Sequence, residues 1–135
     1  MPENTFKVDI SSLDLGQPDL VQELCVYTDG SKTVVGVGAA FVVRIRDSEE
    51  NFHSELFSLS PSSTVFQAEM LAIREAARFL ATLPEEVHTV LYSDSQSALR
   101  ALCSDVITSA LVGQTVTELN CIRGSAVLRL SLIHI

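Results

Sequence analysis

The stretches Thr28-Asp29-Gly30-Ser31 and Ser93-Asp94-Ser95-Gln96 decide the fold that this sequence predicts. Each follows an apolar run with the character of a buried strand, over about residues 24–28 and 87–92. Each motif therefore places a carboxylate just past the end of a strand. Because open sheets with covering helices bind ligands beyond the carboxyl ends of their strands, two aspartates at that edge indicate a divalent-metal site.

The rest of the chain predicts a β-meander followed by a crossover helix. A polar break at Ser60-Pro61-Ser62-Ser63 ends the meander, and Thr64-Val65-Phe66-Gln67 has the form of a capping box that opens a helix. Strands are expected over residues 24–28, 36–45, 52–59 and 87–92, and helices over Thr64 to about Leu83, from near Ser95, and from about Ser104 to Leu119.

The helix that begins at Thr64 carries an acid on its apolar stripe. The residues of this stripe recur at spacings of three and four, as on one face of an α-helix, and they are Phe66, Glu69, Ile73, Ala76 and Leu80. A carboxylate on a face that packs against a sheet is unfavourable unless it is paired or bound to a metal. The alternative for Glu69 is a side chain at the end of the stripe that reaches solvent. A different face is expected to be solvated, and it carries Arg74, Glu75, Arg78 and Thr82.

The predicted topology brings Glu69 to the two aspartates. The third strand of the meander ends at the same edge as Asp29, so the helix begins there, and the next strand returns Asp94 to that edge. A right-handed crossover makes this strand parallel to the first. Three converging carboxylates would repel one another without a cation, which raises at least one pKa, whereas Mg²⁺ or Mn²⁺ would bind them as oxygen ligands.

The motifs in this order resemble type 1 ribonuclease H, and most closely the ribonuclease H domains of non-LTR retrotransposon reverse-transcriptase polyproteins. The resemblance rests on Thr28-Asp29-Gly30-Ser31, Phe66-Gln67-Ala68-Glu69 and Tyr92-Ser93-Asp94-Ser95-Gln96-Ser97-Ala98, and it covers about residues 23–129. It implies an α/β fold in which helices flank a five-stranded mixed sheet, with three antiparallel strands followed by parallel ones.

The resemblance also implies a function and a site. It implies Mg²⁺ (or Mn²⁺) bound by Asp29, Glu69 and Asp94, the first three of four carboxylates, and cleavage of the RNA strand of an RNA–DNA hybrid by two-metal hydrolysis. Asp29 would bridge the two cations. Contacts to the nucleic-acid backbone are implied for Gly30, Ser31 and Gln96. The expected partners are the hybrid and a reverse transcriptase in the same polyprotein.

The chain departs from this family at two places. Val65 and Phe66 stand where cellular members carry asparagines. The family also continues past its fifth strand into a loop with a histidine and a helix with a fourth aspartate, so the last helix is expected to be missing. The fifth strand would then form an uncovered sheet edge, with Val127, Leu128 and Leu130 partly exposed.

The two ends of the chain are expected to lie outside this domain. Residues 1–22 lack periodicity and are interpreted as a linker or tail. Residues 130–135 are similar to the translated end of a sequencing adapter, so they are interpreted as a non-native tail, the alternative being a native strand.

Three functions compete at this stage. The first is the hybrid ribonuclease. The second is a catalytically inactive retroelement remnant that keeps the fold and some nucleic-acid binding, and the missing fourth aspartate is what separates these two. The third is half of a sugar-kinase or actin-like ATPase, which uses a similar sheet but needs a second domain that 135 residues do not accommodate.

Composition limits the setting of the protein. The formal net charge of −8 is opposite to the basic surface of a stand-alone nucleic-acid binder. Three cysteines without a CxxC spacing indicate free thiols in a reducing, intracellular compartment, either cytoplasmic or nuclear. No apolar stretch approaches the roughly 18 residues that a membrane span needs, so no membrane partner is expected.

Overall fold

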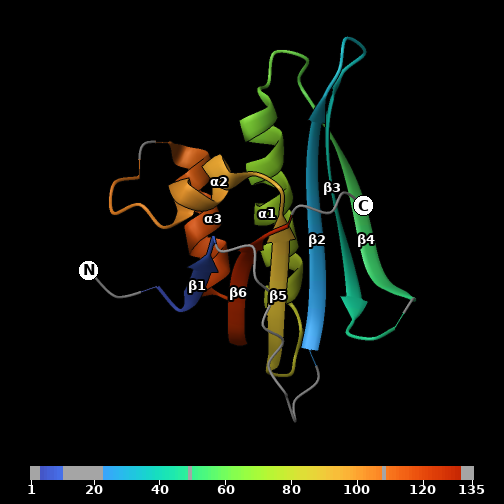
Figure 1. Ribbon diagram of the computed structural model, residues 1–135, viewed down its shortest axis with the longest axis vertical. Coiled ribbons are helices and arrows are strands. Elements are labelled where there is room, and N and C mark those ends of the chain that lie inside the picture. The colour runs from blue at the N-terminus through green and yellow to red at the C-terminus, as the bar shows by residue number, and fades with distance from the viewer. Residues whose placement is uncertain (1–3, 11–22, 49, 108, 132–135) are drawn as a thin grey trace.

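A mixed β-sheet organises the chain in the computed structural model, which describes residues 4–10, 23–48, 50–107 and 109–131. The strand order across the sheet is β1-β6-β5-β2-β3-β4 (Figure 1). The elements in chain order are β1 (Phe6–Asp9), β2 (Glu23–Lys32), β3 (Val37–Ile45), β4 (Asn51–Leu59), α1 (Val65–Ala81), β5 (Val87–Ser93), α2 (Gln96–Leu102), α3 (Ala110–Asn120) and β6 (Gly124–Leu130).

The directions of the strands agree with the prediction. The strands β2, β3 and β4 form an antiparallel meander, while β5 is parallel to β2 and β6 is parallel to β5. In Figure 1 the helix α1 starts at the edge where β2 ends and runs back along the sheet, so that β5 returns to the same edge. The predicted α/β fold with a mixed sheet is therefore confirmed.

The first strand of the meander is longer than the sequence predicted. It was expected to end at Thr28, but β2 continues to Lys32 because it stays paired with β3 as far as Val37. Its pairing with β5 ends earlier, at Tyr27 opposite Tyr92. Asp29 is thus the second residue beyond the last parallel pair, although it still lies in a strand.

A sixth strand, β1, corrects the prediction of five. It pairs in parallel with β6 over Phe6–Asp9, inside the segment interpreted as a linker or tail. Since β6 has neighbours on both sides, the expectation that it forms an uncovered edge is wrong. Leu128 is only 1% exposed, whereas Val127 and Leu130 are partly exposed as predicted. The signal that was missed is the alternation of apolar and polar residues in Phe-Lys-Val-Asp, which is short and lies in an acidic context.

The contribution of β1 to the core leads to a first prediction. Replacing Phe6 by Leu should lower the free energy of unfolding by about 1 kcal/mol, because Phe6 is buried against the main apolar core. The control is Lys7→Ala, an exposed residue of the same strand, which should change it by less than about 0.5 kcal/mol. Urea denaturation measures both variants. Equal, negligible effects would contradict the packing of β1.

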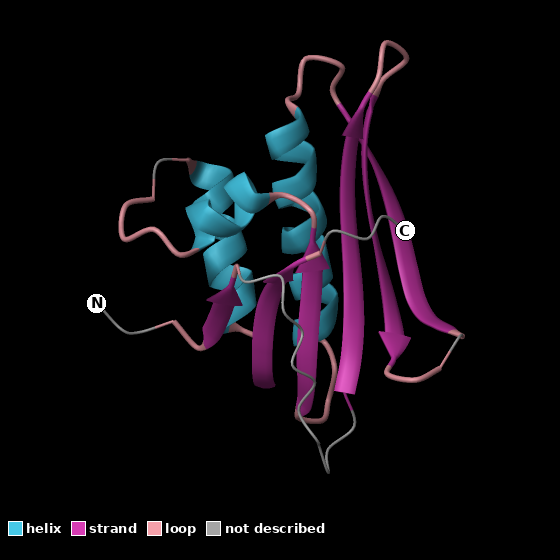
Figure 2. Ribbon diagram, in the orientation of Figure 1, coloured by secondary structure: helices cyan, strands magenta, loops and turns pink. Residues whose placement is uncertain are grey.

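The helices of the described chain cover one face of the sheet (Figure 2). The strand residues of the main core cluster point to that face, among them Val26, Phe41, Leu91 and Leu128. The predicted capping box of α1 is present, with the Thr64 hydroxyl accepting from the Gln67 N–H and the Gln67 side chain accepting from the Thr64 N–H.

Two features of the helices differ from the predictions. The helix α3 begins at Ala110 rather than near Ser104, because the Ser109 hydroxyl caps it by accepting from the Val112 N–H. The polar face of α1 contacts α3 instead of being fully solvated. A hydrogen bond of 2.7 Å joins Arg74 to Gln114 of α3, and an ion pair of 3.4 Å joins Arg78 to Glu118 of α3.

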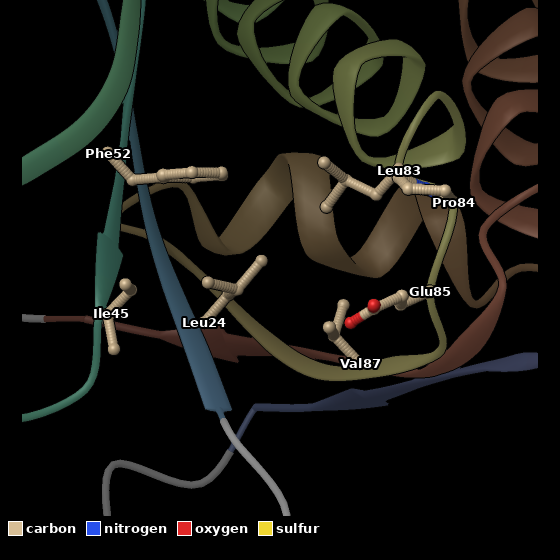
Figure 3. A pocket seen from close by; sticks show the side chains of 7 residues that line it. All are labelled: Leu24, Ile45, Phe52, Leu83, Pro84, Glu85 and Val87. Carbon is tan, nitrogen blue, oxygen red and sulfur yellow. The ribbon is translucent and has the colours of Figure 1, made fainter.

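A small apolar pocket lies at the end of the sheet opposite Asp29. It has a volume of about 180 Å³, and the side chains that line it come from the start of β2, the end of β3, the start of β4 and the loop before β5. Figure 3 shows Leu24, Phe52 and Leu83 facing this space, with Glu85 beside Val87. The pocket therefore lies away from the predicted acidic site. No helix within the described residues has the length and apolar character needed to cross a membrane.

Candidate metal centre

The structure brings the three predicted carboxylates together. Asp29 comes from β2, Glu69 from the start of α1, and Asp94 directly follows β5. One carboxylate oxygen of each residue lies within 4.8 Å of the others. Within the described ranges, no other group of three or more histidine, cysteine, aspartate or glutamate side chains is placed to share a metal ion.

The two aspartates are neighbours because their strands are parallel and adjacent. A hydrogen bond of 3.0 Å from the Thr28 hydroxyl to the Tyr92 carbonyl joins the strands one residue before Asp29 and two before Asp94. The rings of Tyr27 and Tyr92 stack at 5.2 Å between their centroids. These contacts fix the register in which both carboxylates reach the same edge of the sheet.

Glu69 reaches the aspartates because α1 approaches β2 very closely at Gly30. A Cβ atom at Gly30 would lie 2.5 Å from the Glu69 nitrogen and 2.6 Å from its Cγ atom. Only glycine leaves room for the helix backbone at this distance. The sequence associated Gly30 with a nucleic-acid contact, and the structure gives it a packing role as well.

The environment of Glu69 disfavours its charge. The residue is 9% exposed, and burial raises the pKa of its carboxyl above the ordinary value. The charges of Asp94 and Asp29 act in the same direction, while a hydrogen bond from Ser95 lowers the pKa. A bound cation would remove this penalty, because it interacts favourably with all three carboxylates.

Ser95 is a site residue that the sequence analysis missed. Its hydroxyl caps α2 by accepting from the Ala98 N–H at 3.1 Å, and its presence near Glu69 partly offsets the rise in the pKa of that carboxyl. The available signal was its position directly after Asp94, at the start of a predicted helix. That position was interpreted only as the approximate start of a helix.

The predicted nucleic-acid contacts surround the acids. Ser31 is exposed and, with Asp29, lines a depression of about 250 Å³ whose floor includes Gly38 and Ala40 of β3. Gln96 is exposed at the first position of α2, two residues after Asp94. Both side chains are accessible from solvent next to the carboxylates, and their role in nucleic-acid binding stays a prediction.

The donor set of the site suits a hard divalent cation. All three groups offer carboxylate oxygens, which Mg²⁺ and Mn²⁺ prefer over nitrogen or sulfur ligands. Asp29 is exposed and Asp94 is half-buried, so solvent or a substrate oxygen could complete the coordination. The arrangement can therefore bind a metal ion at the sheet edge and leave it accessible.

The fold is that of ribonuclease H. RNase H1 from the halophilic archaeon Halobacterium salinarum NRC-1 superposes with a TM-score of 0.66 at 16% identity, over 82% of this chain and 86% of that chain. The N-terminal RNase H domain of Rv2228c from Mycobacterium tuberculosis superposes with a TM-score of 0.69 at 13% identity, over 83% and 88%. The sequence matches no family model and no curated protein. These superpositions establish a shared fold.

Proposed function

We propose that this chain is a divalent-metal-dependent nuclease that hydrolyses the RNA strand of RNA–DNA hybrids. The observation that carries the proposal is the cluster of Asp29, Glu69 and Asp94 within 4.8 Å, at the carboxyl ends of β2 and β5 of a ribonuclease H fold. Two solved structures with this fold are RNase H proteins by name. The metal ligands, the substrate and the activity are parts of the proposal.

The three carboxylates would hold the cation or cations. When bound, Mg²⁺ or Mn²⁺ supplies a polarised water and neutralises the charge that develops on the phosphate. Asp29, the exposed member, would be the first of the three to meet an incoming substrate. Glu69 is held in place by the packing of α1 on Gly30. The protein thus contributes a preorganised ligand set rather than a nucleophile of its own.

Substrate binding would depend on the cation. The chain has a net charge of −8, and three of its acids stand where a phosphate would have to approach. Without a cation, these charges repel the nucleic-acid backbone. Selection of the RNA strand would rest on its 2′-hydroxyl groups, which Ser31, an exposed residue, and the backbone near Gly30 would contact.

The biological setting forms the second part of the proposal. The motif resemblance supports a domain of a non-LTR retrotransposon polyprotein that also contains a reverse transcriptase. The competing interpretation is an inactive remnant that retains the fold and some nucleic-acid binding. The two interpretations differ in catalytic turnover, since three carboxylates can bind a metal ion without supporting hydrolysis.

A hybrid-cleavage assay tests the function. The chain should cut the RNA strand of a labelled RNA–DNA duplex in Mg²⁺ and leave the same duplex intact in EDTA. Asp29→Asn should reduce cleavage by at least about 10³-fold, because it removes a charged oxygen from the cation site. Asp105→Asn alters an exposed acid outside the cluster and serves as the matched control.

Two outcomes would contradict the proposed activity. Wild-type protein that binds Mg²⁺ but leaves the hybrid uncut would favour the inactive remnant. Cleavage that persists in Asp29→Asn at the wild-type rate would exclude the acid cluster as the catalytic site and would indicate a contaminating nuclease.

A further inference from the structure

The strand β4 ends the sheet, and its outer side has no neighbouring strand among the described residues. It follows β3 in the strand order, and Figure 1 shows it at the margin of the sheet. Proteins usually protect such an edge with lysine, proline or a short strand, because its N–H and C=O groups can pair with another chain. The strand spans nine residues, Asn51–Leu59, and contains neither lysine nor proline. This edge is therefore open to a further strand.

A β-bulge limits the part of β4 that can pair. It lies at Phe52, near the start of the strand, where the register shifts between Val43 and Arg44 of β3. From His53 to Leu59 the pairing with β3 is regular. The midpoint of this regular segment is Leu56.

The side chain of Leu56 stands on the face of the sheet opposite to the helices. Leu56 pairs with Ala40 of β3, and Ala40 pairs with Asp29 of β2, so the three residues form a row across the sheet. Leu56 is 87% exposed, because the side chain of Ala40 beside it is too small to cover it. The segment that can pair thus has an exposed apolar side chain at its centre.

The residues around Leu56 are complementary to a second copy of the same strand. On its face of the sheet, the exposed Ser54 and Ser58 lie two residues before and two residues after it. If two copies pair antiparallel about Leu56, each Ser54 faces the partner's Ser58, and the two Leu56 side chains face each other. On the other face, Glu55 is opposite the partner's Phe57, so like charges are not placed directly opposite. This symmetry is that of an isologous two-fold interface.

We propose that two copies of this chain associate through β4, which pairs antiparallel with the partner's β4 about a two-fold axis at Leu56. The inference goes beyond the proposed function and does not depend on the metal centre. Leu56 lines the depression that also contains Asp29 and Ser31. The partner's Leu56 would stand next to it and extend that wall, while the two acid clusters would lie at opposite ends of the joined sheet.

Sedimentation velocity on the full chain tests the association. The interface is small, so concentrations from about 1 μM to 1 mM cover the expected range, and the wild type should pass from the mass of a monomer to that of a dimer. Leu56→Lys places two like charges opposite each other and should raise the Kd of the dimer at least about tenfold. Val34→Lys is the matched control, because Val34 is also exposed and apolar but lies in the turn after β2. Its Kd should stay within about threefold of the wild-type value.

Engineered disulfides test the register of the paired strands. The exposed thiols are first removed by Cys103→Ser and Cys121→Ser. In this background, Leu56→Cys places two thiols across the two-fold axis with Cα atoms about 4.5–5.5 Å apart, which suits a disulfide, so oxidation should give a covalent dimer. Ser54→Cys and Ser58→Cys should not cross-link alone, because each lies about 14 Å from its own copy. Mixed together, these two variants should form a covalent heterodimer.

Each other outcome overturns a stated part of the proposal. A wild-type chain that stays monomeric up to about 1 mM overturns the association. A dimer with an unchanged Kd in Leu56→Lys overturns β4 as the interface. A dimer that Ser54→Cys or Ser58→Cys cross-links alone, while Leu56→Cys does not, overturns the register. Hybrid cleavage is not among these readouts, so none of these failures bears on the proposed nuclease activity.

Discussion

Glu69→Gln is expected to make the metal-free protein more stable and to abolish its proposed activity. The substitution removes a buried ionisable group whose pKa is raised by burial and by Asp94 and Asp29, and it keeps the size of the side chain. At about pH 7.5 in EDTA, the gain should be about 1 kcal/mol, or roughly 4 °C in thermal midpoint. Hybrid cleavage in Mg²⁺ should fall by at least about 10³-fold.

The pH dependence gives the same prediction a second test. Because the pKa of Glu69 is raised in the folded state, its contribution to stability is present at low pH and is lost as pH rises through that pKa. The advantage of Glu69→Gln in EDTA should therefore shrink toward pH 4, where the wild-type carboxyl is protonated in both states. The control is Glu85→Gln, which alters an exposed acid. Its change in stability relative to wild type should stay near zero at every pH. A lower midpoint for Glu69→Gln near neutral pH would contradict the account.

Gly30→Ala is expected to cost about 2–3 kcal/mol of folding stability, the upper range for overpacking. The added methyl group would lie 2.5–2.7 Å from the backbone and Cγ of Glu69 and the backbone of Ala68, so α1 itself must move. Since that shift displaces the Glu69 carboxylate, Mg²⁺ affinity should fall in the variant molecules that remain folded. Chemical denaturation and Mg²⁺ titration measure the two effects.

Gly36 supplies the matched control for Gly30. It lies in the turn that follows β2, and a Cβ atom there would meet nothing within 4 Å. Gly36→Ala should change stability by less than about 0.5 kcal/mol or slightly increase it, because it restricts the unfolded chain. Equal losses in the two variants would show that the effect at Gly30 comes from the hairpin backbone and not from the approach of α1.

The parts of the fold that could be predicted are the elements whose apolar residues follow a regular spacing along a whole helix or strand. The stripe through Glu69 predicted the buried face of α1, and the apolar runs before Asp29 and Asp94 predicted two neighbouring parallel strands. These elements carry the three acids, so their convergence could be reasoned from topology. The capping box at Thr64 located the start of α1 to the residue.

The parts that escaped prediction depend on contacts between segments distant in the sequence. The strand β1 has four residues and is stabilised by pairing with β6, which lies more than a hundred residues later. The extension of β2 through Asp29 exists because β3 stays paired with it. The roles of Gly30 and Ser95 arise from the distance between α1 and its neighbours, and a sequence pattern does not contain that distance.

The most direct test of the metal centre is the anomalous scattering of crystals soaked in Mn²⁺. The account predicts a peak in contact with carboxylate oxygens of Asp29, Glu69 and Asp94, at the metal–oxygen distances of about 2.0–2.6 Å that hard cations adopt. The peak should be absent from crystals of Asp29→Asn soaked in the same way. A wild-type crystal with no manganese between these three residues, or with manganese bound only to other acids, would contradict the central claim.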